Sequence, residues 1–185
     1  RRTKETRISV DLCLEGGEIR ISTGIGFFDH MLTAFAFYGG LGLKIEAEGD
    51  LEVDGHHTVE DTGIVFGAAL AQALGDKKGI RRVGSCFLPM DESLAFCALD
   101  ISGRPYLAFD AAFPAEMCGG YASELTEEFF RAVSVSSGIT LHLKAEGRNT
   151  HHMIEALYKA FARALRDAAA LDPRVKGVPS TKGVL

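Results

Sequence analysis

Residues 47–60 read AEGDLEVDGHHTVE, and residues 145–155 read AEGRNTHHMIE. Both stretches open with Ala-Glu-Gly, and both close with two adjacent histidines and a glutamate three positions after the second histidine. The second stretch is three residues shorter between these shared parts. Similar composition alone would not keep a double histidine and a glutamate in register, so the sequence predicts an internal duplication.

The likeness extends beyond these two stretches. Upstream, Ala34, Gly40 and Leu43 match identical residues 98 positions later, and downstream Phe66 and Leu70 match identical residues 95 positions later. We therefore predict two similar halves, residues 1–83 and residues 84–185, with a C-terminal loop at the end of the second. Since the chain has only 185 residues, the halves are expected to pack as one compact unit.

Hydrophobic periodicity predicts the same order of elements in each half: two strands, a helix, a strand and a long helix. In the first half these are residues 7–14, 18–22, 28–37, 41–47 and 58–74, and in the second half residues 85–89, 93–101, 125–133, 140–145 and 152–170. Gly16-Gly17 predicts a hairpin turn between the first two strands. Each half is then a sheet covered by two helices, which makes the fold class α+β.

The two histidine pairs predict a metal site with two ions. On a helix, residues three or four apart share a face, so Glu60 can join His56 or His57 at one ion, and Glu155 can join His151 or His152. Adjacent histidines point about 100° apart, so each pair suits two ions better than one. Imidazole and carboxylate ligands without a thiolate fit Mn, Fe or Zn, and the carboxylate share favours Mn or Fe. Surface histidines at a helix start are the alternative, and the in-register repeat argues against it.

Two further residues occupy matching places early in the first helix of each half. These residues, His30 and Glu128, precede the double histidines by equivalent distances once the three-residue deletion is counted. Each is a candidate metal ligand, and a polar residue at a helix end is the alternative reading of each. His142 alternates with apolar residues on a predicted strand and is expected to be structural.

Composition excludes several classes of function. The formal net charge of −5 does not favour a nucleic-acid partner. No apolar run approaches the roughly 18 residues that a membrane helix requires, so no membrane partner is expected. The four cysteines show no C-x-x-C spacing and are predicted to be reduced and buried in a cytoplasmic protein, with disulfides as the alternative.

Four spaced motifs give the chain a family resemblance. They are GFFDHML at residues 26–32, HHTVED at residues 56–61, DISGRPY at residues 100–106 and GRNTHHMIEA at residues 147–156. With the tail PSTKG at residues 179–183, they resemble the imidazoleglycerol-phosphate dehydratases over essentially the whole chain. These enzymes of histidine biosynthesis are lyases that dehydrate D-erythro-imidazole glycerol phosphate to imidazole acetol phosphate.

The resemblance implies a ribosomal protein S5 domain 2-like α+β fold, a homo-oligomer of 24 subunits, and two Mn(II) ions per active site, bound between subunits. The implied metal ligands are His30, His56, His57, Glu60, Glu128, His151, His152 and Glu155. One expected division places His56, Glu128, His151 and Glu155 on one ion and the other four on the second. Glu128 departs from the histidine usual at its position, and Tyr38 also replaces a common histidine.

The resemblance also implies residues for the substrate. Positions that match the family's phosphate-binding residues are Arg82, Arg104, Lys159, Ser180 and Lys182. Glu5 and Glu155 are the expected proton-transferring carboxylates, because a carboxylate near the reacting carbon can act as general acid or base. Taken singly, each of these charged residues also fits an ordinary solvated surface.

Two rival functions use the same ligands. A dinuclear hydrolase such as a phosphatase would employ the His/Glu cluster to activate water, although its usual Asp-rich loops are not evident. A non-catalytic metal-binding shell protein would need the ligands only to join subunits. It would not need the phosphate-binding residues, which favours the enzyme.

Overall fold

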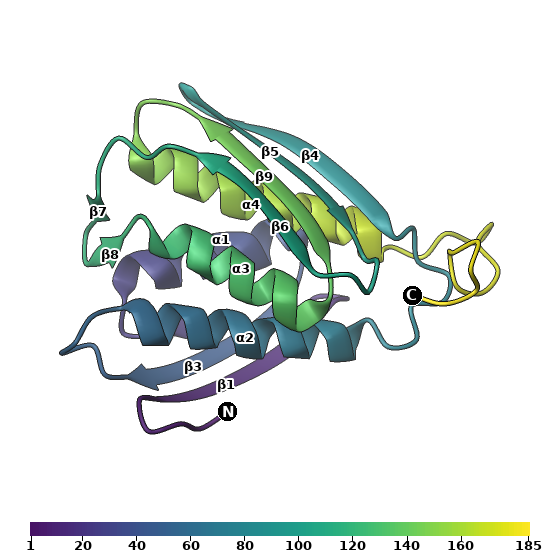
Figure 1. The fold of residues 1–185 in the computed structure, drawn as a ribbon, viewed down its shortest axis with the longest axis horizontal. Coiled ribbons are helices and arrows are strands. Elements are labelled where there is room, and N and C mark those ends of the chain that lie inside the picture. The colour runs from purple at the N-terminus through teal and green to yellow at the C-terminus, as the bar shows by residue number, and fades with distance from the viewer.

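The computed structural model describes all 185 residues, with four helices between two large β-sheets and a small two-stranded sheet beside them (Figure 1). One sheet carries the order β1-β3-β2 and the other the order β4-β5-β9-β6. Each sheet turns an apolar face toward the helices, and 38 buried residues form one continuous core between them. The predicted α+β class is confirmed, with two helices covering each sheet.

The first half contains β1 (Thr6–Cys13), β2 (Ile19–Ser22), α1 (Gly26–Gly39), β3 (Gly42–Gly49) and α2 (His56–Ala73). The predicted hairpin between β1 and β2 is wrong, because β3 lies between them, antiparallel to β1 and parallel to β2. Gly16 and Gly17 do reverse the chain, at φ of 103° and 146°. Gly42, at the start of β3, fits inside this turn because a Cβ there would lie 2.8 Å from the Gly16 carbonyl oxygen.

The second half repeats this arrangement with three strands added, one at the edge of its sheet and two in a separate short pair. Its elements are β4 (Val83–Met90), β5 (Ser93–Asp100), β6 (Tyr106–Ala111), β7 (Met117–Cys118), β8 (Tyr121–Ala122), α3 (Leu125–Ser137), β9 (Thr140–Glu146) and α4 (Thr150–Ala169). Strands β5-β9-β6 reproduce the order and directions of β1-β3-β2. The sequence matched β4 and β5 to the first two strands and missed β6; the true counterparts are β5 and β6. The division at residues 83 and 84 stays a prediction.

The helices meet in parallel pairs in the middle of the molecule. Gly63 of α2 lies against α3, where a Cβ would come within 2.8 Å of both Ala132 and the Phe129 carbonyl oxygen. One turn later Gly67 lies equally close to Ser136, so α2 and α3 run in the same direction. In the other pair, Phe35 of α1 stacks on Phe161 of α4. Parallel pairing brings the start of α1 beside that of α4, and the start of α2 beside that of α3.

The cysteines and the helix lengths test two further predictions. All four cysteines are free, as predicted. Cys97 is buried, but Cys13 is exposed, so the prediction that all are buried is wrong for Cys13. None of the helices is long and apolar enough to cross a bilayer.

Candidate metal centre

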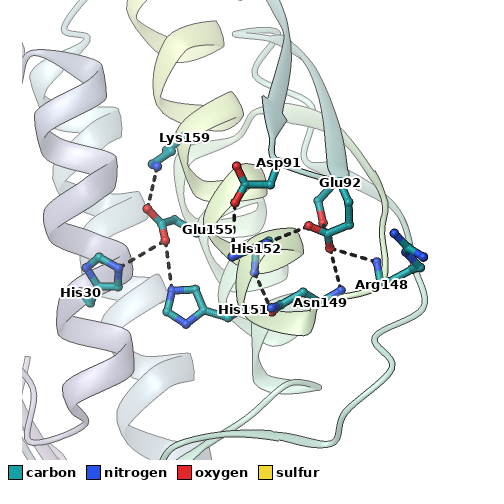
Figure 2. Close-up of polar contacts among 10 residues, drawn as sticks. His30, Asp91, Glu92, Arg148, Asn149, His151, His152, Glu155 and Lys159 are labelled. Carbon is teal, nitrogen blue, oxygen red and sulfur yellow. Dashed lines mark hydrogen bonds and ion pairs between the residues drawn. The ribbon is translucent and has the colours of Figure 1, made fainter.

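The first turn of α4 presents two histidines in different directions (Figure 2). Asn149 caps the helix, and its side-chain oxygen accepts the backbone N–H of His152 at 3.3 Å. This cap satisfies one of the free amides of the first turn and fixes where the helix begins. Since the helix begins there, His151 faces α1 while His152 faces the turn between β4 and β5.

His30, His151 and Glu155 form what we call the α1–α4 set. Glu155 Oε2 lies 3.3 Å from His30 Nε2 and 3.1 Å from His151 Nε2. One donor atom from each of the three residues lies within 4.8 Å of the others. Two imidazoles and a carboxylate that converge in this way can hold one divalent metal ion.

Lys159 completes the surroundings of Glu155 (Figure 2). Its ammonium lies 2.6 Å from Glu155 Oε1, and both side chains are almost buried, at 12% and 8% exposure. Burial alone raises the pKa of Glu155, but the hydrogen bond and charge of Lys159, together with His30 and His151, outweigh it and lower the pKa. The Lys159 ammonium also lies 4.7 Å from the centre of the Tyr38 ring. Glu155 is therefore held as an ionised carboxylate.

His56, Glu60 and Glu128 form the α2–α3 set, the internal counterpart of the α1–α4 set. His56 Nε2 lies 3.9 Å from Glu60 Oε2, and both side chains are about half exposed. Because Gly63 packs on Ala132, the turn of α3 that carries Glu128 lies beside the turn of α2 that carries Glu60. Glu128 takes the place that His30 has in the other half, and its nearest charged partner is Arg131, at 3.6 Å.

The remaining two histidines are held by carboxylates from loops. His57 Nδ1 lies 3.0 Å from Asp50 Oδ2, and this hydrogen bond raises the pKa of His57. His152 Nδ1 lies 2.9 Å from Glu92 Oε2 (Figure 2). That bond raises the pKa of His152 and lowers the pKa of Glu92 to about 2. Neither histidine reaches the metal-binding set of its own helix.

Four of the expected phosphate-binding residues gather at the opposite end of α4. The Arg82 guanidinium binds Asp100 with two hydrogen bonds of 2.7 and 3.0 Å and donates a third to the Pro179 carbonyl oxygen. Arg104 lies 3.8 Å from the same Asp100 and is 65% exposed. Two more expected residues, Ser180 and Lys182, lie on the adjoining tail, where the Lys182 N–H donates to Ser180 Oγ.

This cluster of expected phosphate-binding residues is far from the α1–α4 set within one chain. The Arg82 N–H donates to the Ala168 carbonyl oxygen, near the last turn of α4. Glu155 lies 13 residues earlier on the same helix, a distance of about 20 Å at the α-helical rise. Lys159, the fifth expected phosphate-binding residue, stays with Glu155 instead of joining the other four.

Glu5 lies at the edge of the first sheet, near His57. Its backbone carbonyl accepts the N–H of Asp50, and its charge adds to the effect of Asp50 in raising the pKa of His57. Its carboxylate makes no hydrogen bond or ion pair. It opens instead on a polar hollow of about 380 Å³. Glu5 and Glu155 are thus not brought together by one chain.

The ligand candidates and their division between two ions stay predictions, but the structure shows which candidates lie together. The expected division put His30 on a different ion from His151 and Glu155, but the structure places these three together because α1 and α4 are parallel neighbours. His142 is exposed on a strand and far from both sets, beside Tyr106.

Three supporting residues were missed, namely Asp50, Glu92 and Asn149. Asn149 could have been predicted as the N-cap of α4, because asparagine is favoured at that position and stands two residues before the double histidine. Asp50 and Glu92 carried none, because acidic residues next to a glycine or at a strand end are common.

Comparison with known proteins gives consistent results. The family model described as imidazoleglycerol-phosphate dehydratase matches residues 23–165. A relative of that name from Symbiobacterium thermophilum is 62% identical, over 100% of this chain and 90% of the relative. Another from Acetivibrio thermocellus is 59% identical, over 100% of this chain and 96% of the relative.

Two crystal structures resemble the fold. Imidazoleglycerol-phosphate dehydratase from Staphylococcus aureus aligns with a TM-score of 0.85 at 46% identity, over 90% of this chain and 95% of that chain. The enzyme from Pyrococcus furiosus, solved in complex with (S)-C348, aligns with a TM-score of 0.86 at 40% identity, over 100% and 99% of the two chains.

Proposed function

Since this chain belongs to the imidazoleglycerol-phosphate dehydratase family, and is a hydro-lyase of histidine biosynthesis, we propose that a pair of Mn(II) ions serves its active site. The reaction is the dehydration of D-erythro-imidazole glycerol phosphate to imidazole acetol phosphate. The convergence of His30, His151 and Glu155 is the observation that carries the metal proposal. A cytoplasmic location is part of the same proposal.

The donor chemistry of the α1–α4 set fits such an ion. Two imidazole nitrogens and one carboxylate oxygen lie within reach of a common point, and no thiolate is present. Lys159 keeps the carboxylate ionised, as a metal ligand must be. The α2–α3 set supplies its internal counterpart from His56, Glu60 and Glu128. Two such sets, each built from one helix of the first half and one helix of the second, support two ions per chain.

Each set offers only three ligands from one chain, and this supports assembly. His57 and His152 are the remaining candidate ligands, and both face away from the set on their own helix. We propose that they ligate ions held by a neighbouring copy, in a large homo-oligomer of 24 subunits. Metal binding and assembly are then coupled.

The position of the expected phosphate-binding residues also supports a site shared between copies of the chain. Arg104, Ser180 and Lys182 lie with Arg82 about 20 Å from Glu155 along α4, which is farther than a three-carbon phosphate with an imidazole ring can span. A substrate bound to both groups therefore takes its metal ligands from one copy and its phosphate-binding residues from another. Arg104 is the exposed guanidinium, free to make paired hydrogen bonds to phosphate.

The side chains divide the chemistry among them. Bound Mn(II) would supply a Lewis acid and a template for the imidazole ring and a hydroxyl group. Arg82, Arg104, Ser180 and Lys182 bind the phosphate and fix the orientation of the substrate. Lys159 orients Glu155, and the carboxylate of Glu5, which lines an open polar hollow, would transfer a proton at the reacting carbons. Both carboxylates are proposed proton carriers.

The test combines metal analysis with a product assay. Protein purified without chelator should contain about two Mn-type ions per chain. It should convert imidazole glycerol phosphate to imidazole acetol phosphate with the phosphate retained. Absence of any transition metal, with no stimulation by Mn(II), would contradict the metal proposal. Release of inorganic phosphate in place of water would favour a phosphatase.

A further inference from the structure

His57 and His152 are held differently from the other histidines of the site. Both use Nδ1 to contact a carboxylate from outside their own helix: Asp50, at 3.0 and 3.1 Å, or Glu92, at 2.9 Å. His30, His56 and His151 instead direct Nε2 toward a glutamate on a central helix. Two orientations of imidazole thus coexist around the same ligand sets.

The carboxylate contact fixes which nitrogen carries the proton, and the Nε2 of His152 then lies 3.9 Å from Asp91 Oδ2, too far for a hydrogen bond. An ionised carboxylate can only accept a hydrogen bond, so the Nδ1 of each histidine must be the donor. A neutral imidazole with its proton on Nδ1 keeps its lone pair on Nε2, the form that a metal ligand requires. The side chains of His57 and His152 are 34% and 26% exposed, so each can be reached from outside the chain.

We propose that Asp50 and Glu92 are positioning residues, which hold His57 and His152 with Nε2 ready to ligate an ion carried by another copy of the chain. This inference rests on the proposed metal site shared between copies. A ligand that crosses an interface gains most from being fixed in advance, because its own helix does not orient it toward the ion.

The internal duplication explains why two different carboxylates serve the two histidines. Thr6 pairs with Gly49, and Ser93 stands against the matching Gly147, so Glu5 and Glu92 occupy equivalent positions just before their strands. In the first half Asp50 follows the glycine and holds the histidine. In the second half Arg148 follows the glycine, and the carboxylate comes from Glu92 instead.

This exchange leaves the equivalent glutamates with different surroundings. Glu92 accepts hydrogen bonds from the Ser93 hydroxyl and from the backbone N–H groups of Arg148 and Asn149, as well as from His152. Glu5 has no side-chain partner. Glu92 is therefore rigidly placed for holding a ligand, while Glu5 is left free for proton transfer.

The experiment removes each carboxylate from the full-length assembled protein. Mn(II) is withdrawn from wild type and variants with increasing chelator, and the chelator concentration that removes half the metal is measured. Asp50→Ala and Glu92→Ala should lower the Mn(II) affinity about 10- to 100-fold. Asp50→Asn should fall between wild type and Asp50→Ala, since an amide oxygen still accepts the Nδ1 hydrogen bond but lacks the charge.

Matched controls separate this effect from loss of surface charge or loss of fold. Glu52→Ala removes an exposed carboxylate from the same loop as Asp50, and Glu146→Ala removes one near the second site. Both should retain wild-type metal affinity. Glu92→Gln keeps an oxygen that accepts hydrogen bonds but loses the charge, so, like Asp50→Asn, it should weaken Mn(II) binding in part, and it provides the test even if Glu92→Ala fails to fold.

The outcomes distinguish this inference from the function on which it rests. Wild-type protein without Mn(II) would overturn both. Metal-containing wild type, with Asp50→Ala and Glu92→Gln releasing Mn(II) at the same chelator concentration as the two controls, would overturn the inference alone. Weakened binding in these variants and rescue by Asp50→Asn would support it.

Discussion

The internal duplication relates the α1–α4 set to the α2–α3 set, since each joins one helix of the first half to one of the second, yet the two sets differ in how far one chain completes them. In the α1–α4 set a buried Glu155 lies 3.1 and 3.3 Å from two histidines and is held by Lys159. In the α2–α3 set Glu60 is half exposed and lies 3.9 Å from His56, and Glu128 stands at the position where the other set has His30. The duplication therefore preserved the ligand positions in both sets, but only the α1–α4 set is organised by one chain before a metal binds.

The largest contrast is expected from removing the glutamate of each set. Glu155→Ala leaves the Lys159 ammonium unpaired in a nearly buried position, which should destabilise the metal-free protein by about 3 kcal/mol. Glu60→Ala removes an exposed contact and should cost under about 1 kcal/mol. Urea denaturation of the metal-free variants measures both. Equal losses would show that burial does not distinguish the two sets.

Metal removal should reveal the same contrast in the assembled protein. As chelator is added, the α2–α3 ion should leave first, because that set is less organised and more exposed. Complete removal should break the large particle into smaller units. Metal analysis and light scattering on the same samples follow both steps. Loss of both ions at the same chelator concentration would contradict the expected difference between the two sets. A particle size that does not change with metal would contradict metal-dependent assembly.

Substitutions of Glu128 test directly how the two sets differ, because Glu128 stands where the α1–α4 set has His30. Glu128→Ala should lower Mn(II) affinity about 10-fold or more, while the fold is retained. Glu128→His should retain most activity, because imidazole is the side chain that His30 supplies at the equivalent place. A Mn(II) titration of the three proteins checks this. Unchanged affinity in Glu128→Ala would mean that the carboxylate only pairs with Arg131.

The smallest expected effect is on the pH dependence of folding stability in the metal-free protein, through the contact between His152 and Glu92. Glu92 has its pKa lowered from 4.5 to about 2, so its stabilisation is present above pH 4.5 and is lost as the pH falls through 2. His152 has a raised pKa, so its contribution is present below pH 6.5 and is lost as the pH rises through the folded value.

The stability difference between wild type and Glu92→Gln should therefore be largest between about pH 4.5 and 6.5. Denaturation midpoints across that range provide the measurement. A difference that does not change with pH would show that the contact contributes no charge-dependent stability.

The sequence predicted the elements well because periodicity and repeated motifs are local signals. Helices α2 and α4 and their histidines were found from spacing alone. The insertion of β3 between β1 and β2 was not predicted, since strand order depends on packing between distant segments. The proximity of His30 to His151 was not predicted for the same reason, because it depends on which helices lie side by side.

The supporting carboxylates of the site were also beyond sequence reasoning. Asp50 and Glu92 serve equivalent histidines from non-equivalent positions, so the repeat itself gave no guide to them. The separation of Arg82 from Glu155, about 20 Å or 13 helical residues, could not be predicted either, because it depends on where Arg82 contacts α4.

The central claim is that one active site combines metal ligands from one copy with phosphate-binding residues from another, and mixed assembly tests it most directly. His151→Ala and Arg104→Ala should each be inactive alone. When the two metal-free variants are mixed in equal amounts and reassembled with Mn(II), about a quarter of the sites should receive an intact residue from each copy, so activity should return to about that fraction of wild type. If each chain carried a complete site, every site in the mixture would lack one of the two residues, and no recovery above the separate variants would contradict the account.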